Sequence, residues 1–151
     1  MIATYKKIEK HDIEILVAMM RDFYAIDGYQ MNDQEARDLF MEFITNENLG
    51  RAWLIIADES IVGYVILTFV FSFEYKGKIA FLDELYIAER ARGKGIGKET
   101  IQFIKAQVQI LSLKMVYLEV ENHNVIAQQL YLSNGFDLHN RKFLSYKTQI
   151  T

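Results

Sequence analysis

Three apolar runs of strand-like composition follow one another in the middle of the chain, and they constrain its fold more than any other feature. They cover residues 52–57, 61–73 and 78–87, and they are rich in β-branched and aromatic side chains. The connections between them, residues 58–60 and 75–77, have the length of hairpin turns. This pattern predicts a meander in which each strand pairs with the next.

Helical spacing of apolar residues precedes the meander. We expect Asp12 to cap a first helix and Gly28 to end it, because a short acceptor side chain favours a helix start and glycine favours a stop. Asn32 or Asp33 is expected to cap a second helix, which ends near residues 46–50.

The second half of the chain continues with alternating helices and strands. Apolar residues at helical spacing predict a helix over residues 96–111, and Asn124 is expected to cap another that runs to residue 133. The remaining predicted strands are residues 2–8, 114–120, 136–138 and 143–146. The order β-α-α-β-β-β-α-β-α-β-β predicts a single domain over residues 1–151 with an α+β (mixed α/β) fold around a central mixed sheet.

Composition excludes several classes of function. The chain has no cysteine, which excludes disulfides, thiolate catalysis and cysteine-based zinc sites, and its three histidines lack metal-ligand spacing, so we expect no metal. Its net charge of −3 gives no support to a nucleic-acid partner.

The longest apolar run is interrupted by Gly63, Thr68 and Ser72, so we expect no membrane span. Without a signal peptide or cysteines, a cytoplasmic location is expected.

A glycine-rich stretch, R-G-K-G-I-G over residues 92–97, lies between a predicted strand and a predicted helix. Glycines let backbone N–H groups converge, and a helix N-terminus adds partial positive charge, so the stretch suits a phosphate; the alternative is a tight turn without a ligand. The spacing fits neither the dinucleotide fingerprint, which would place glycine where Lys98 stands, nor the Walker A loop.

The same stretch resembles the acyl-CoA loop, R/Q-x-x-G-x-G/A, of the GNAT superfamily of N-acetyltransferases, with Arg92, Gly95 and Gly97 at its defining positions. A second similarity is N-x-x-A-x-x-L-Y-x-x-x-G-F, which begins at Asn124, and a third is the strand L-E-V around Glu119. The predicted order of elements also resembles that family, so the resemblance covers nearly the whole chain.

The resemblance implies acetyl-CoA as the acetyl donor and a set of residues that would bind it. The strand before the loop would pair with the pantetheine arm, the loop N–H groups would hold the pyrophosphate, and an asparagine would bond the arm. The residues at these positions are Leu85, Tyr86 and Ile87 in the strand, Arg92, Gly93, Lys94, Gly95, Ile96, Gly97 and Lys98 in the loop, and Asn124.

The resemblance also implies catalytic groups. Tyr131 matches the tyrosine that protonates the departing thiolate; the alternative is an aromatic that only packs in the core. Glu84 and Glu119 are the expected bases, and Asp83 is expected to contact substrate. Because strand residues alternate, only one of Asp83 and Glu84 is expected to reach the cleft unless a bulge intervenes. Tyr24 and Tyr29 would border the acceptor pocket.

The predicted function is acetyl-CoA-dependent N-acetylation of a primary amine by direct attack in a ternary complex. The acidic residues near the expected site favour a small cationic amine as acceptor. The alternatives are a peptide or protein amine, a non-catalytic CoA-binding module on the same fold, and a protein that binds another nucleotide. A homodimer is possible, with residues 69–73 as a candidate interface if they are exposed.

Overall fold

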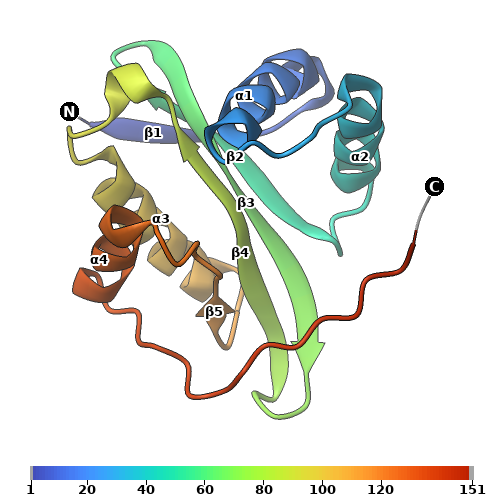
Figure 1. Cartoon of the computed structure of the whole chain (residues 1–151), viewed down its shortest axis with the longest axis vertical. Coiled ribbons are helices and arrows are strands. Elements are labelled where there is room, and N and C mark those ends of the chain that lie inside the picture. The colour runs from blue at the N-terminus through green and yellow to red at the C-terminus, as the bar shows by residue number, and fades with distance from the viewer. Residues whose placement is uncertain (1, 150–151) are drawn as a thin grey trace.

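A five-stranded sheet forms the centre of the computed structural model, which describes residues 2–149 (Figure 1). The strands lie side by side in chain order: β1 (Ala3–Lys7), β2 (Gly50–Ala57), β3 (Ser60–Ser72), β4 (Gly77–Ile87) and β5 (Val116–Tyr117). The first four pair antiparallel, and β5 pairs parallel with β4. The predicted meander is confirmed as β2, β3 and β4, and the mixed α+β class is confirmed with it.

Helices cover both faces of this sheet. Figure 1 shows α1 (Ile13–Ile26) and α2 (Asp33–Thr45) on one side, and α3 (Ile96–Ile110) and α4 (Val125–Ser133) on the other. Alternation along β3 serves both layers, because Tyr64 packs with the core of α1 and α2 whereas Val65 packs with Ile104 of α3. Within residues 2–149, no helix combines the length and apolar character needed to cross a membrane.

Two of the three predicted caps hold. The side chain of Asn32 accepts a hydrogen bond from the backbone N–H of Glu35 at 2.9 Å, and that of Asn124 accepts one from Ala127 at 3.1 Å. Asp12 stands at the start of α1, but its carboxylate instead accepts bonds from Lys6 Nζ at 2.6 Å and from the backbone N–H of Glu9. The carboxylate of Asp12 therefore binds the ammonium group of Lys6 and does not cap α1.

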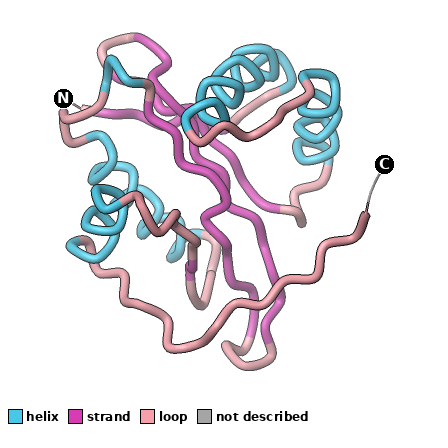
Figure 2. The backbone as a smooth tube through the Cα atoms, in the orientation of Figure 1, coloured by secondary structure: helices cyan, strands magenta, loops and turns pink. Residues whose placement is uncertain are grey.

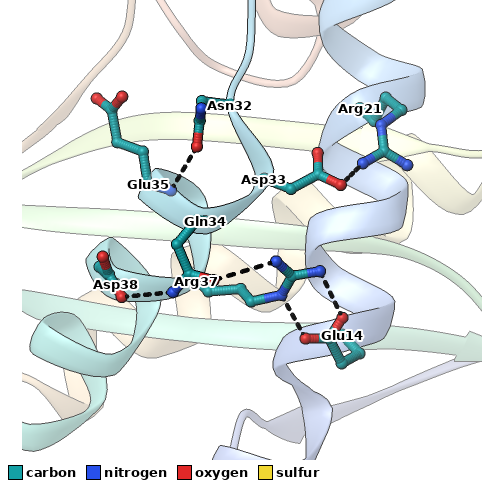
Figure 3. Close-up of polar contacts among 8 residues, drawn as sticks. All are labelled: Glu14, Arg21, Asn32, Asp33, Gln34, Glu35, Arg37 and Asp38. Carbon is teal, nitrogen blue, oxygen red and sulfur yellow. Dashed lines mark hydrogen bonds and ion pairs between the residues drawn. The ribbon is translucent and has the colours of Figure 1, made fainter.

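Ion pairs on the surface join α1 to α2 (Figure 3). The guanidinium of Arg37 donates to both carboxylate oxygens of Glu14, at 2.5 and 3.2 Å, and Arg21 pairs with Asp33. Such exposed pairs contribute little stability individually, but here they bridge the two helices on either side of one connection. The connection, residues 27–32, carries Tyr29 to the functional site described below.

The end of the chain departs from the sequence-based expectation. Only Val116 and Tyr117 of the predicted strand 114–120 pair with β4, and residues 136–138 and 143–146 form no strand. Figure 2 shows the chain after α4 as an extended segment along the outside of the molecule. A strand requires a partner for its backbone groups, and this segment finds none among the described residues of its own chain.

Candidate active site

A cavity of about 350 Å³ opens where the last two strands of the sheet separate. β4 and β5 pair only at Ala80–Val116 and Phe81–Tyr117, although β4 continues to Ile87. Beyond Phe81 the edge of β4 therefore has no strand beside it. The lining comes from α1 and the connection after it, from β4, from the chain between β5 and α4, and from α4: Phe23, Asp27, Tyr29, Leu82, Asp83, Glu84, Leu85, Leu118, Glu119, Val120, Glu121, Asn122, Asn124, Ala127 and Tyr131.

A β-bulge in β4 brings two neighbouring carboxylates to this cavity. Ile66 of β3 lies opposite Glu84 and Leu67 lies opposite Leu82, so Asp83 has no partner across the sheet. An extra residue in one strand locally breaks the alternation of side chains between the faces. Both Asp83 and Glu84 consequently line the cavity. Strand alternation alone predicted only one of them there, and a bulge was the stated exception.

Two tyrosines hold the carboxylate of Glu84. Tyr24 of α1 donates a hydrogen bond to Oε2 at 2.6 Å, and Tyr64 of β3 donates one to Oε1 at 2.7 Å. Burial raises the pKa of Glu84, and the two hydrogen bonds oppose that rise because they stabilise the ionised form. Burial and the carboxylate also raise the pKa of both tyrosines, so the phenols stay protonated and remain donors.

Tyr64 is a member of the site that sequence reasoning missed. It is fully buried and lies on β3 opposite Tyr86, two positions along from the pairing of Ile66 with Glu84. Its position next to Glu84 depends on the register between β3 and β4, including the bulge. A tyrosine within an apolar run is the only sequence signal, and it does not reveal that register.

A second pair of carboxylates lies in the same cavity. Asp83 of β4 and Glu119, just beyond β5, both line the cavity. Partial desolvation and then the negative charge of Glu119 raise the pKa of Asp83. Two carboxylates that repel each other in one cavity favour a bound cation, because it relieves the repulsion.

Tyr131 projects from α4 into the same cavity, beside the carboxylates. Its ring packs edge-on against Phe136, with the ring centroids 5.5 Å apart. Burial raises the pKa of the phenol to about 12, so it carries its proton at neutral pH. Within residues 2–149 the hydroxyl makes no hydrogen bond, which leaves its proton available to a bound molecule.

Tyr29 and Glu121 form the outer wall. The hydroxyl of Tyr29 donates to the carboxylate of Glu121, which joins the α1–α2 connection to the chain after β5. Nearby, His123 lies 3.2 Å from the carboxylate of Asp27. The lining thus contains five carboxylates (Asp27, Asp83, Glu84, Glu119 and Glu121) and no lysine or arginine among the described residues.

The glycine loop lies at the other end of the open edge of β4. Gly93 and Gly95 have positive φ angles of 73° and 85°, and no other part of the described chain lies within 4 Å of the place where a side chain would begin. Gly95 is the N-cap of α3, so the N–H groups of the first helical turn point out of the helix end without intrahelical partners. The exposed loop therefore presents donors and open space together, as an anion requires.

The predicted donor-binding residues are thus only partly brought together with the catalytic ones. Leu85 lines the cavity, and β4 continues from it through Tyr86 and Ile87 toward the glycine loop. None of the loop residues 92–98 lines the cavity. Arg92 turns back, with its Nε donating to the backbone oxygen of Ile87 at 2.8 Å. Asn124 lines the cavity, but its side-chain oxygen already caps α4.

Comparison with known proteins identifies a family and several similar proteins. The model of the acetyltransferase (GNAT) family matches residues 15–136. A D-amino-acid N-acetyltransferase of Saccharomyces cerevisiae is 27% identical over 131 residues, which are 83% of this chain and 80% of that protein. A spermine/spermidine N(1)-acetyltransferase of Bacillus subtilis is 35% identical over 57 residues, 37% of this chain and 38% of the other.

A solved structure of an integron cassette protein from the mobile metagenome of Cole Harbour Salt Marsh is also similar. It has a TM-score of 0.85 and 29% sequence identity, and the alignment covers 95% of this chain and 89% of that one. The family match confirms the resemblance seen in the sequence motifs, together with the acetyltransferase class and the expected acetyl-CoA donor. The chain belongs to the acetyltransferase (GNAT) family.

Proposed function

We propose that this protein transfers the acetyl group of acetyl-CoA to the primary amine nitrogen of a small cationic molecule. The observation that carries the proposal is the lining of the cavity, which contains five carboxylates together with Tyr131 and no lysine or arginine among the described residues. A site with one sign of charge raises the local concentration of ligands of the opposite sign. Two of the similar proteins are named for small amine acceptors, a D-amino acid and a polyamine, which supports a small molecule as acceptor, and the polyamine is a cation.

The donor would lie along the open edge of β4 and the glycine loop. The described residues fit such a group, because the edge from Leu85 to Ile87 lacks a strand partner and the space around Gly93 and Gly95 is open. In the proposed arrangement the backbone of the edge binds the extended arm, and the loop N–H groups bind the phosphates. Lys94 and Lys98 add positive charge around the loop. Acetyl-CoA supplies the activated acetyl group as a thioester.

The transfer needs two proton movements, and the cavity holds a candidate for each. An ammonium must lose a proton before its nitrogen attacks, and the thiolate that leaves is stabilised by gaining one. Tyr131, a protonated phenol with no partner among the described residues, is proposed as the donor to the thiolate. Glu84 is proposed as the acceptor, directly or through water, because its position is fixed by two hydrogen bonds and its pKa is raised. Glu119 is the alternative base.

Substitution Glu84→Gln is expected to lower kcat about tenfold, which is less than the usual loss for an acid–base group because Asp83 and Glu119 line the same cavity and can replace the lost carboxylate. A base works only when ionised, so kcat of the unmodified protein should fall as the pH drops through the raised pKa of Glu84. The variant should lose that fall. A pH profile of kcat measures this, with Glu119→Gln as the matched control. If only Glu119→Gln loses the fall, the base is Glu119.

The function itself is tested first by thermal melting with acetyl-CoA, NAD and ATP at matched concentrations. A ligand at a hundred times its Kd stabilises the folded state by about 2.7 kcal/mol, so a shift with acetyl-CoA alone is expected. Release of CoA is then measured with polyamines, amino sugars, amino acids and a peptide. The cationic acceptors should give the highest kcat/KM, and added salt should lower it.

The variant Glu121→Gln should raise KM for the cationic acceptor, whereas Glu59→Gln, in the turn between β2 and β3, should leave it unchanged. A melting shift without CoA release from any amine would identify a non-catalytic CoA-binding protein instead. A higher kcat/KM for the peptide than for the small amines would show that the acceptor is a peptide or protein amine. An unchanged melting temperature in the presence of acetyl-CoA would contradict the proposed function.

A further inference from the structure

The carboxylate of Glu84 is held from two different elements, with one phenol on each oxygen. Tyr64 of β3 donates to Oε1 at 2.7 Å, and Tyr24 of α1 donates to Oε2 at 2.6 Å. A carboxylate bound through one oxygen can still turn, whereas donors on both oxygens oppose that rotation. Each ionised oxygen can accept two hydrogen bonds, so both oxygens keep a free position for a further donor.

Tyr64 has little freedom to move. It lies on an inner strand and pairs with Leu54 of β2 and with Tyr86 of β4. Its side chain is fully buried and packs near the rings of Phe23 and Tyr86, with centroids 6.4 and 5.8 Å away. Among the described residues its hydroxyl bonds only to Glu84. A phenylalanine would fill the same space without a buried hydroxyl, so the bond to Glu84 is what the hydroxyl adds.

Tyr24 lies in the last turn of α1, where the helix leads into the connection over residues 27–32. Its backbone oxygen accepts a hydrogen bond from the N–H of Tyr29 at 2.9 Å, and the two rings meet edge to face with centroids 6.5 Å apart. The phenol is therefore attached to the connection that forms the outer wall of the cavity. Glu84 is thus bound both to the middle of the sheet and to that wall.

The two phenols are the groups that stabilise the ionised form of Glu84. Burial and the charge of Asp83 raise its pKa, and the bonds from Tyr24 and Tyr64 lower it. Neither phenol lines the cavity, so among the described residues they contact the carboxylate and not the space for a substrate. The other titratable groups of the lining face Glu84 from the connection after α1, from the chain between β5 and α4, and from α4, and none is a cation: Asp27, Tyr29, Glu119, Glu121 and Tyr131.

We propose that Tyr24 and Tyr64 are positioning residues for the transfer, which hold Glu84 ionised and in one orientation and act only through it. The proposal rests on the proposed function, in which Glu84 accepts the proton of the ammonium. It assigns neither phenol a contact with the substrate. Because the phenols stabilise only the ionised carboxylate, their loss has its largest effect at a pH where the carboxyl group takes up a proton.

An NMR titration of the Glu84 carboxyl carbon, in protein labelled with carbon-13 glutamate, tests this hold directly. The spectrum of Glu84→Gln assigns the signal. Tyr64→Phe and Tyr24→Phe each remove one donor to the ionised form, so the pKa of Glu84 should rise by about one pH unit in each variant. Tyr5→Phe is the matched control and should leave this titration unchanged, because the Tyr5 hydroxyl bonds to Thr100 at 3.0 Å and its ring stacks on Phe103 of α3.

The pH profile of kcat shows whether the same hold serves the transfer. In both tyrosine variants the fall of kcat toward low pH should begin about one pH unit higher, which is a loss of about tenfold on the acidic side and none at high pH. A purely structural defect would lower kcat at every pH. In a Glu84→Gln background, Tyr64→Phe should change kcat little further, because it acts only through that carboxylate.

Three results would overturn the proposal: an unmoved titration of Glu84 in both variants, a fall of kcat that stays in place although the titration moves, or additive losses in the double variant Glu84→Gln/Tyr64→Phe. Melting temperatures confirm that each variant is folded, and Tyr24→Phe, at a helix end, provides the measurement if Tyr64→Phe does not fold. The titration requires no acetyl transfer. A titration that moves in a protein that never releases CoA would therefore contradict the proposed function and not the hold of the phenols on Glu84.

Discussion

Replacement of Tyr131 by phenylalanine is expected to lower kcat by about a hundredfold, within the usual range for loss of a general acid. The phenol is protonated at neutral pH, since burial raises its pKa to about 12, and among the described residues its hydroxyl has no partner. Removal of the oxygen leaves the ring and its packing against Phe136 in place. The variant should therefore keep the affinity of the unmodified protein for acetyl-CoA.

Steady-state kinetics with the best acceptor measures kcat, and the melting shift with acetyl-CoA measures donor binding. The matched control is Tyr117→Phe, because Tyr117 of β5 packs with a tilted ring against Phe81 of β4 and does not line the cavity of the candidate active site. An unchanged kcat in the Tyr131→Phe variant would exclude the hydroxyl from the mechanism. A lost melting shift would assign the residue to donor binding or to packing instead.

Substitution Gly63→Ala should destabilise the protein by about 3 kcal/mol, the upper part of the range for overpacking in a well-packed core. A β-carbon on Gly63 would lie 2.0 Å from the backbone oxygen of Tyr86 and 3.2 Å from the Cα of Ile87. Backbone atoms cannot turn aside as a side chain can, so β3 and β4 would have to separate. The part of β4 that would move is the edge proposed to bind the donor arm.

Thermal melting measures the loss, and a decrease in Tm of roughly 6–12 °C corresponds to it for a protein of this size. Gly28→Ala is an informative comparison, since nothing lies within 4 Å of its added carbon and only its positive φ angle of 73° opposes the substitution. Its effect should be smaller, about 1 kcal/mol. Equal effects of the two substitutions would show that the close contact in the sheet is tolerated by a shift of the strands.

The elements that the sequence predicts well are those with a local signal. The runs that became β2, β3 and β4 differ from their predicted bounds by two residues at most, because continuous apolar composition and short turns specify a meander without reference to the rest of the chain. The helix that follows Asn124 begins and ends as predicted for the same reason. The family resemblance depended on these local motifs and is confirmed by the family match.

The features that the sequence did not predict depend on pairing between distant residues. The hydrogen bond from Tyr64 to Glu84 requires the register of β3 on β4, and the position of the bulge is part of that register. The predicted strands 136–138 and 143–146 have suitable composition, yet they form no strand because pairing is decided by the available edge and not by composition. The cytoplasmic location, the single-domain assignment and the role of each site residue stay predictions.

The bulge at Asp83 has a consequence for how such a protein can change. A residue without a partner across the sheet takes no part in cross-strand packing, so its replacement disturbs few of the contacts that hold β3 and β4 together. The raised pKa of Asp83 shows that the folded state disfavours its charge, so a neutral side chain there should be tolerated or even stabilising at neutral pH. Position 83 is therefore the point at which mutation can retune the charge of the cavity while the fold stays intact, and a search for variants with new acceptors is best begun there.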